Sequence, residues 1–307
     1  PVLKEQDETF GMENWEQAES AMQKQAADLA LEKENIHRRE VRYLFAGDLL
    51  GQLIATSFGT VDLEIPLFGL YGACSTMGEA LGLGAMCVNA GYADRVLTLA
   101  SSHYATAEKQ FRFPLEYGNQ RPYSASWTVT GCGAVLLSSG NFRGKEPPLA
   151  KITAMTTGKI VDMDFHDSMN MGAAMAPAAA QTLLDFFNDT ATKPEDYDRI
   201  YTGDLGVVGT KLLYELLREN GIVLRNHEDC GLILFDREAQ DVHAGGSGCG
   251  CSASVLAGHL MKLLTGGQIR RLLFAATGAL MSPTASMQGQ SIPGICHAVA
   301  IETQVNA

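Results

Sequence analysis

The sequence predicts an α/β protein made of two similar halves, and three observations support this. Short apolar runs typical of strands alternate with helical segments, which favours a largely parallel sheet covered by helices. Four sequence matches between the halves keep the same order along the chain. They pair residues 44–49 with 200–205, 73–75 with 250–252, 95–101 with 271–277, and 133–137 with 297–301. The shared Gly-Asp-Leu and Cys-Ser weigh against chance likeness between apolar strands, so we predict a duplicated unit.

We assign residues 1–147 to an N-terminal half and residues 148–307 to a C-terminal half. The first half opens with an amphipathic helix over residues 13–31, where apolar residues recur every three or four positions. The expected elements that follow are a strand at 41–46, a short helix at 52–58, a strand at 67–70, a helix at 77–90, a strand at 96–100 and a strand at 128–139. The polar stretch 104–126 predicts a long excursion, of a kind that often carries function.

The second half repeats this order after a polar link at residues 140–148. A strand is expected at 149–156 and a helix at 174–188, in which Pro177 is acceptable only in the first turn. A further strand at 200–202 leads into Gly203-Asp204-Leu205, the counterpart of Gly47-Asp48-Leu49.

Charge and cysteine usage exclude several classes of function. The 307 residues carry a formal net charge of -12 and form no basic stripe, so nucleic-acid binding is not expected. The sequence shows no signal peptide and no apolar run of about 18 residues, so no transmembrane helix is predicted. Its seven cysteines include no CxxC pair. They predict reduced thiols in a reducing compartment rather than a disulfide framework.

Cys74 stands out because of its neighbours. It follows a predicted strand and precedes Ser75 and Thr76, either of which could cap the next helix. A cysteine at a helix N-terminus should have a lowered pKa, because the helix dipole and unpaired N–H groups favour the thiolate. Cys74 is therefore a candidate nucleophile. The alternative is a small apolar side chain packed at a crowded turn.

The duplicated unit with a strand–cysteine–helix turn resembles the thiolase and ketoacyl synthase superfamily. The resemblance implies five layers, αβαβα, with two central helices that start at the repeated Cys-Ser positions, and usually a homodimer. In the condensing enzymes of that superfamily, the position of Cys74 holds the acyl-accepting cysteine.

Longer motifs narrow the resemblance to the stage V sporulation protein AD family. They are Leu44–Leu50, Tyr71–Thr76, Ser101–Glu108, Thr128–Gly131, Met175–Ala180 and Gly245–Cys249. The likeness runs from about Trp15 to Glu302. That family has an early strand before the first helix which this sequence lacks, so the edge of the first sheet is expected to be incomplete.

Condensation needs a base and oxyanion donors besides a nucleophile. The superfamily's histidine position falls near Gly203-Asp204-Leu205, and its asparagine position falls at Cys249. We therefore expect a binding protein rather than an enzyme. One alternative is an acyltransferase or condensing enzyme that uses Cys74 with His103 or His297 as base. Another is a purely structural subunit of a membrane complex.

The resemblance implies binding of dipicolinic acid and support of its uptake into the forespore, peripherally at the inner membrane, with membrane proteins of the stage V sporulation A operon. N–H groups at Ser75, His103 past a strand end, and Arg112 or Arg121 on the excursion could meet the two carboxylates. Calcium could bridge the ligand to Asp48 or Asp204, although these aspartates could simply cap helices, and His103 could serve only its loop. No other cofactor or protein-bound metal is expected. The candidate ligand-binding residues are Asp48, Cys74, Ser75, His103, Arg112, Asp204 and Cys249.

Overall fold

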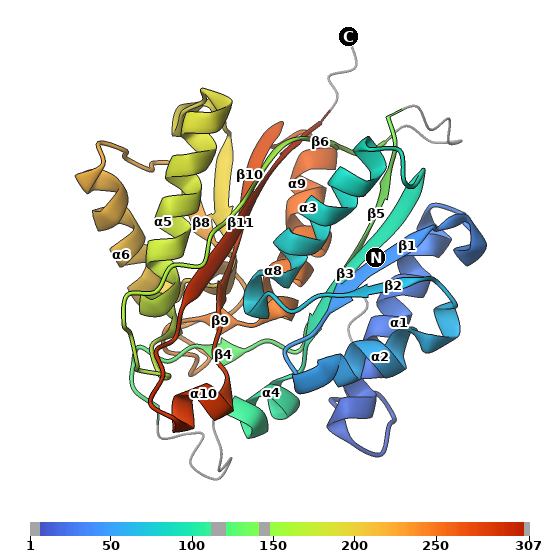
Figure 1. The fold of residues 1–307 in the computed structure, drawn as a ribbon, viewed down its shortest axis with the longest axis horizontal. Coiled ribbons are helices and arrows are strands. Elements are labelled where there is room, and N and C mark those ends of the chain that lie inside the picture. The colour runs from blue at the N-terminus through green and yellow to red at the C-terminus, as the bar shows by residue number, and fades with distance from the viewer. Residues whose placement is uncertain (1–6, 112–120, 141–147, 304–307) are drawn as a thin grey trace.

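The computed structural model describes residues 7–111, 121–140 and 148–303, and it has the expected five layers. Two main sheets enclose a central layer of helices, and further helices cover the two outer faces (Figure 1). The predicted αβαβα fold class is confirmed. Among the described residues, no helix has both the length and the apolar character needed to cross a membrane.

The first sheet has the strand order β2-β1-β3-β5. Strand β1 pairs in parallel with β2 and β3, whereas β5 pairs antiparallel with β3. The bounds are β1 (Tyr43–Gly47), β2 (Leu67–Gly69), β3 (Arg95–Ser102) and β5 (Gly131–Ser138).

The second sheet repeats this arrangement in the order β8-β7-β10-β11-β6. Strand β7 pairs in parallel with β8 and β10, and β11 pairs antiparallel with β10 and β6. The bounds are β6 (Lys151–Thr157), β7 (Arg199–Thr202), β8 (His227–Asp229), β10 (Arg271–Ala279) and β11 (Gly294–Glu302). The sheets differ at one edge: β6 pairs with β11 in the second sheet, whereas no strand in the described part of the chain pairs with the outer side of β5 in the first. The boundary between the halves, at residues 147 and 148, stays a prediction, because residues 141–147 lie outside the described ranges.

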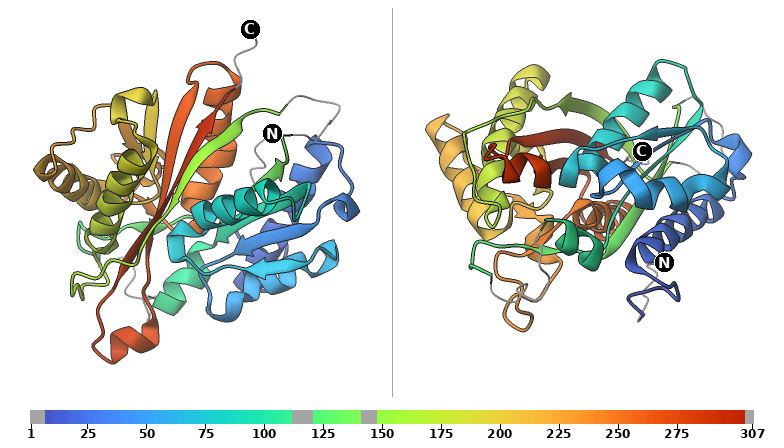
Figure 2. Two further views of the ribbon diagram at one scale, coloured as in Figure 1. Left: turned by 45° about the horizontal axis from the view of Figure 1, so that its top comes forward. Right: turned by 60° about the horizontal axis from the view of Figure 1, so that its bottom comes forward.

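Helices fill the three remaining layers, as the two views in Figure 2 also show. Helices α1 (Trp15–Lys33) and α2 (Ile54–Thr60) lie on the outer side of the first sheet, and α5 (Met171–Thr190) and α6 (Gly206–Glu219) lie on the outer side of the second. The central layer contains α3 (Thr76–Asn89) and α8 (Cys249–Val255), which continues as a π-helical turn into α9 (Met261–Thr265).

The central layer is thin because small residues bring helix and sheet together. A Cβ atom added at Gly78 of α3 would lie 2.7 Å from the Cβ of Ala276 on β10. A Cβ added at Gly250 of α8 would lie 2.3 Å from the carbonyl oxygen of Gly131. The glycines near the Cys-Ser positions therefore serve close packing at the junction of the halves.

Two expectations about local structure were wrong. The polar stretch after β3 is not all loop, because it begins with α4 (Tyr104–Phe111), whose Thr106, Ala107 and Glu108 are buried. Pro114 and Pro122 follow Phe111 in the sequence, so they do not oppose this helix. Helix α5 starts at Met171, capped by the Asn170 side chain, so Pro177 lies in its second turn rather than its first.

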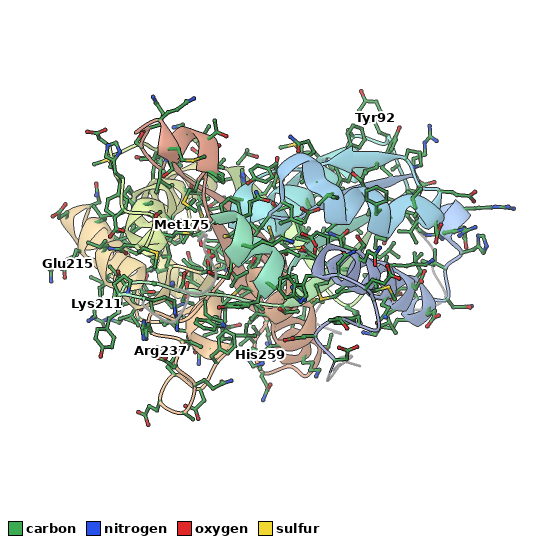
Figure 3. All side chains as sticks on the ribbon, turned by 90° about the horizontal axis from the view of Figure 1, so that it is seen from below. Tyr92, Met175, Lys211, Glu215, Arg237 and His259 are labelled. Carbon is green, nitrogen blue, oxygen red and sulfur yellow. The ribbon has the colours of Figure 1, made fainter. Side chains whose placement is uncertain are left out.

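The remaining strands and α-helices are short. They are the strand pair β4 (Trp127–Thr128) and β9 (Gly246–Ser247), and the helices α7 (Cys230–Ile233) and α10 (Pro283–Met287). The surface carries scattered apolar side chains, of which Tyr92, in the turn after α3, is 74% exposed (Figure 3). All seven cysteines are free, as predicted.

Candidate ligand pocket between the halves

Cys74 lies in a single 3₁₀ turn, Ala73–Ser75, directly before α3. Side-chain hydroxyls build this turn, because Ser75 Oγ donates to the Gly72 carbonyl at 2.6 Å and Thr76 Oγ1 donates to the Ala73 carbonyl at 2.7 Å. Ser75 occupies the predicted N-cap position of α3, but neither its side chain nor that of Thr76 makes a capping hydrogen bond, because both hydroxyls donate to carbonyls of the turn. The turn directs the Cys74 thiol toward the C-terminal half, where Sγ lies 3.8 Å from Ser247 Oγ.

The expected thiolate at Cys74 is wrong. Burial raises the pKa of this thiol well above its usual range, and the nearby Asp204 carboxylate and Cys249 raise it further. The N–H groups at the turn cannot compensate. Ser75 N–H donates to the Gly72 carbonyl and Thr76 N–H donates to the Ala73 carbonyl. These N–H groups are also unavailable to a ligand, contrary to our expectation for Ser75.

Asp204 is a fully buried carboxyl beneath Cys74. It accepts hydrogen bonds from Ser247 Oγ at 2.7 Å, from Gly248 N–H at 3.0 Å and from Thr277 Oγ1 at 2.8 Å. Burial raises the pKa of Asp204, although these hydrogen bonds oppose the rise. Its oxygens are occupied, so the structure does not support it as a calcium ligand.

The two repeat-related aspartates have different roles. Asp204 does not cap α6, because Asp229 does so, accepting from the N–H groups of Leu205 at 2.9 Å and Gly206 at 3.1 Å. Asp48 does bind the next helix, through the N–H and hydroxyl of Thr56 at 2.8 and 2.6 Å. Asp48 does not line the pocket, and its occupied oxygens oppose the calcium interpretation there too.

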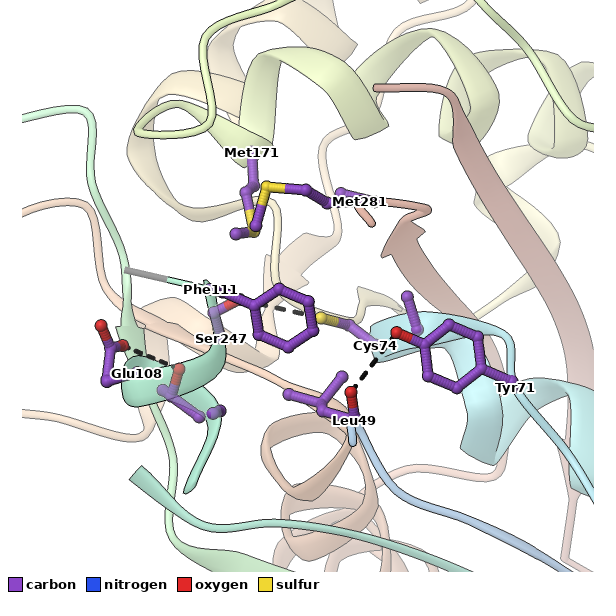
Figure 4. Close-up of a pocket in the computed structure, with 12 residues that line it drawn as sticks. Leu49, Tyr71, Cys74, Glu108, Phe111, Met171, Ser247 and Met281 are labelled. Atoms are coloured by element: carbon purple, nitrogen blue, oxygen red, sulfur yellow. Dashed lines mark hydrogen bonds between the residues drawn. The ribbon is translucent and has the colours of Figure 1, made fainter. Parts of the chain in front are cut away.

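A pocket lies over Cys74 at the seam between the halves (Figure 4). Its polar lining residues are Tyr71, Cys74, Glu108, Thr128 and Ser247. Apolar side chains, including Leu49, Phe111, Met171 and Met281, complete the wall. None of the described lining residues is a lysine, arginine or histidine.

The cavity has a volume of about 30 Å³, which is room for one or two water molecules. A cavity that holds benzene is about 150 Å³. An aromatic ligand therefore requires lining side chains to move. Met171 and Met281 lie together over the pocket, and Phe111 lies beside the contact between Cys74 and Ser247 (Figure 4). Unbranched methionines change conformation easily, so movement of Met171 and Met281 can enlarge the cavity.

The other candidate residues lie outside this pocket. His103 is buried but serves its loop, with Nε2 2.9 Å from the Glu8 carbonyl oxygen and Nδ1 accepting from Ala105 N–H. Cys249 donates its thiol hydrogen to the Ala73 carbonyl at 2.9 Å. Arg112 lies outside the described residues. The Arg121 side chain is buried against the Trp127 ring at 3.5 Å and donates to the Asp241 carbonyl.

Neither proposed base reaches Cys74. His103 is held in its loop, and His297 Nδ1 accepts from Gly158 N–H at 3.3 Å on strand β11. Burial lowers the pKa of His297 to about 4. The described residues that line the pocket place hydroxyl and carboxyl groups near the thiol in place of a histidine.

Sequence reasoning missed several pocket residues. Ser247 lies in the glycine-rich segment before α8, and a serine among glycines is not a pattern that predicts a pocket residue. Thr128 and Glu108 are joined by a hydrogen bond of 2.9 Å, although nothing in their spacing predicts this. Met171 and Met281 come from α5 and the segment after β10, and no local pattern connects them.

Comparisons with known proteins agree with the fold. The tetronic acid condensing enzyme AbyA1 superposes with a TM-score of 0.61 at 17% identity, covering 92% of this chain and 85% of that one. The 3-oxoacyl-[acyl-carrier-protein] synthase III of Aquifex aeolicus gives 0.56 at 14% identity, over 92% and 84%. OleA of Xanthomonas campestris gives 0.60 at 14% identity, over 92% and 79%. The chain thus has the fold of the thiolase-like condensing enzymes.

The sequence comparisons identify the family. The profile described as stage V sporulation protein AD matches residues 3–302. Stage V sporulation protein AD of Bacillus subtilis is 43% identical over 290 residues, which is 94% of this chain and 84% of the relative. The chain belongs to the stage V sporulation protein AD family.

Proposed function

We propose that this protein is a non-catalytic sporulation protein that binds dipicolinic acid in the pocket over Cys74. It supports uptake of the acid into the forespore, peripherally at the inner membrane, with membrane proteins of the stage V sporulation A operon. The main support is the pocket at the seam. The Cys74 thiol in this pocket is protonated, and the described residues that line the pocket include no histidine. Such a pocket retains the position of a condensing site without its base.

Several features support binding rather than acyl transfer. A nucleophilic cysteine is activated by a lowered pKa or an adjacent base, whereas the pKa of Cys74 is raised. Ser247 is the polar group near its thiol, and its own proton is directed to Asp204. The apolar wall suits a flat aromatic ring. The ring nitrogen of dipicolinate can accept a hydrogen bond from the Cys74 S–H.

Calorimetric titration with dipicolinate and with isophthalate tests the ligand. Isophthalate has the same two carboxylates but lacks the ring nitrogen, so we expect dipicolinate to bind more tightly. Phe111→Ala should weaken dipicolinate binding by about fivefold, because an aromatic contact contributes about 1 kcal/mol. Phe58→Ala, at a side chain 70% exposed, is the matched control. Equal affinity for both acids, or no binding, contradicts the proposal.

A second experiment separates binding from catalysis. The protein is incubated with acyl-CoA thioesters of several chain lengths and its intact mass is measured. We expect no adduct, because the pKa of the Cys74 thiol is raised and no histidine is among the described residues that line the pocket. An acyl adduct that disappears in Cys74→Ser would establish acyl transfer and refute the non-catalytic proposal.

We also propose that the functional unit is a homodimer in which two copies meet along β2. This strand pairs only with β1 among the described strands, and it lies at the edge of the first sheet. Leu67, Phe68 and Tyr71, on and next to this edge, are 41%, 50% and 44% exposed. Unpaired edges with apolar side chains are typical of association surfaces. Phe68→Lys should shift sedimentation toward the monomer, whereas Val223→Lys, on the other half, should not. A dimer retained in Phe68→Lys refutes this interface.

A further inference from the structure

A second cavity lies on the outer side of the C-terminal half, between the ends of α5 and α6, which lie side by side (Figure 1). It has a volume of about 440 Å³, which is within the range of ligand pockets. It is an open groove, since its lining residue Val223 is 53% exposed. The residues that line it are Leu184, Phe187 and Asn188 on α5, the loop residues Thr192–Glu195, and Gly221–Val223 after α6. None of them lines the pocket over Cys74.

The loops that follow α1 and α5 repeat one backbone structure. Asn35 and Ala191, after the ends of these helices, both adopt a left-handed conformation, with φ of 51° and 52°. The turns His37–Glu40 and Lys193–Asp196 then close in the same way, because the N–H of the first residue donates to the side-chain carboxylate of the last at 3.0 and 2.9 Å. All these pairs have the same spacing in the sequence as the matched strands β1 and β7. Arg38 of the first half therefore corresponds to Pro194 of the second.

Arg38 joins two segments that lie apart in the sequence of the first half. Its guanidinium donates to the Asp62 carbonyl at 2.5 Å and to Glu64 at 3.2 Å. Asp62 lies in the 3₁₀ turn Val61–Leu63, which continues α2, so Arg38 connects the loop after one outer helix to the end of the next. The corresponding helices of the second half are α5 and α6. Pro194 carries no hydrogen-bond donor, and the space between its loop and the end of α6 is the groove.

The electrostatics of the groove suit a guanidinium group. Helices α5 and α6 end beside it, at Thr190 and Glu219, and the C-terminal end of a helix carries a partial negative charge that favours a cation. Lys193 and Glu195 are both exposed and balance each other in formal charge, so the two helix ends leave the groove negative. A guanidinium is more weakly hydrated than the ammonium group of lysine, and it therefore tolerates a site that is partly apolar.

The walls of the groove supply that apolar surface. Leu184 and Phe187 come from α5, and Ile222 and Val223 come from the segment after α6. The first half has Asp28 at the position that corresponds to Leu184, so the second half is more apolar at this position. The methylene groups of an arginine side chain pack on such surfaces, and a groove of this volume accommodates a ligand larger than one side chain.

We propose that this groove binds an arginine side chain, together with an apolar residue near it, from an exposed segment of a partner protein. In the first half the chain itself supplies the arginine, and Ile36, two positions before Arg38, packs against the core. The corresponding position in the second half is Pro194, so a second protein supplies the arginine there. The site is separate from the pocket over Cys74, and the inference does not depend on the proposed function.

A synthetic array of seven-residue peptides tests this preference. Each peptide carries arginine, lysine or citrulline at its centre among varied residues, and the array is probed with the labelled full chain. Citrulline has the shape of arginine without its charge. We expect the binding peptides to be enriched in central arginine with an apolar residue one or two positions away. Exchange of that arginine for citrulline should weaken binding at least tenfold in fluorescence anisotropy.

Two outcomes of the array contradict the proposal. An array without this enrichment, or equal binding of the arginine and citrulline peptides, would overturn the preference for arginine. Free arginine that competes as strongly as the peptides would overturn the assignment to a protein segment, because it would identify a site for a small guanidinium compound.

Pro194→Arg locates the site. The new side chain can reach the end of α6 as Arg38 reaches Asp62, so the variant should keep or raise the urea midpoint and bind the selected peptides at least tenfold more weakly. Pro148→Arg, at an exposed proline that does not line the groove, is the matched control and should bind like the wild type. Val223→Ser is the second variant if Pro194→Arg does not fold, and it should weaken binding about fivefold. Undiminished binding by folded Pro194→Arg, or by Val223→Ser, would refute binding in this groove.

Discussion

Replacing Glu19 by glutamine should remove a loss of stability that sets in as the pH rises. Glu19 lies on α1 with 1% of its surface exposed. It accepts from Ser101 Oγ at 2.7 Å and from Thr106 Oγ1 at 2.9 Å. Burial, and then the charge of Asp48, raise the pKa of this carboxyl from 4.5 to about 8. At neutral pH the folded protein therefore keeps a proton on Glu19.

The sign and size of the effect follow from this difference in pKa. Below pH 4.5 both the folded and the unfolded chain hold the proton, so the contribution of Glu19 to stability is fully present. Above that pH the unfolded chain releases the proton and the folded chain retains it. Each pH unit then lowers the free energy of unfolding by up to about 1.4 kcal/mol. From pH 5 to pH 8, the loss due to Glu19 is about 3 kcal/mol.

Glutamine can keep the same hydrogen bonds without the titration. Its carbonyl oxygen can accept from Ser101, and its NH₂ group can donate to Thr106, whose hydroxyl already lies 3.0 Å from the His103 carbonyl oxygen. The free energy of unfolding of Glu19→Gln should thus depend less on pH than that of the wild type. The difference should emerge mainly at pH 8, where the variant should be the more stable protein.

Urea unfolding at pH 5 and pH 8 measures this directly. The quantity compared is the pH-dependent change in the free energy of unfolding, wild type against Glu19→Gln. Other titrating groups are common to both proteins and cancel. Glu32→Gln, at an exposed position of the same helix, is the control and should behave like the wild type. The reasoning is refuted if wild type and Glu19→Gln change by the same amount between the two pH values.

Three further predictions concern the seam and the second half. Gly250→Ala should destabilise the protein by about 2 kcal/mol, measured by urea unfolding, because its Cβ would lie 2.3 Å from the Gly131 carbonyl oxygen; an unchanged midpoint would contradict the close packing. Iodoacetamide at pH 8 should modify half-buried Cys87 well before buried Cys74, as peptide mass spectrometry can follow, and the reverse order would contradict the raised pKa of the Cys74 thiol. Asp229→Ala should lower the free energy of unfolding by about 3 kcal/mol, because it removes three hydrogen bonds, two of them from N–H groups at the start of α6. A thermal unfolding midpoint equal to that of the wild type would refute this role.

The duplicated architecture was predictable because strand pattern and repeat order are local features. The matched segments fall on β1 and β7, on β3 and β10, and on β5 and β11, which occupy equivalent places in the two sheets. Strand β8 was not predictable, because three polar residues carry no strand periodicity. Helix α4 was missed since the composition of residues 104–126 was averaged over a segment that is only partly helical.

The candidate site was less predictable, because its properties depend on contacts across the seam. The position of Cys74 before a helix was evident from its neighbours. Its protonation state was not, since burial and the Asp204 carboxylate, 130 positions away in sequence, outweigh the helix dipole. Ser247 and Thr128 come from the two short strands β9 and β4, whose pairing no local pattern indicates.

The repeat-related residues show how one unit acquires two environments. Asp48 and Asp204 occupy matching positions in the sequence repeat, yet Asp48 binds the backbone and hydroxyl of Thr56 on α2, whereas Asp204 binds Ser247 beside the pocket. Likewise Cys251, the counterpart of Cys74, has its Sγ 3.8 Å from the Gly203 carbonyl oxygen and does not line the pocket over Cys74. The difference comes from partners within each half that the repeat does not share: Thr56 on α2 binds Asp48, whereas Ser247 and Gly248, just before α8, bind Asp204. Ser247→Ala, at a residue that lines the pocket, should therefore change ligand binding more than Cys251→Ser, at the repeat-related position that does not line it.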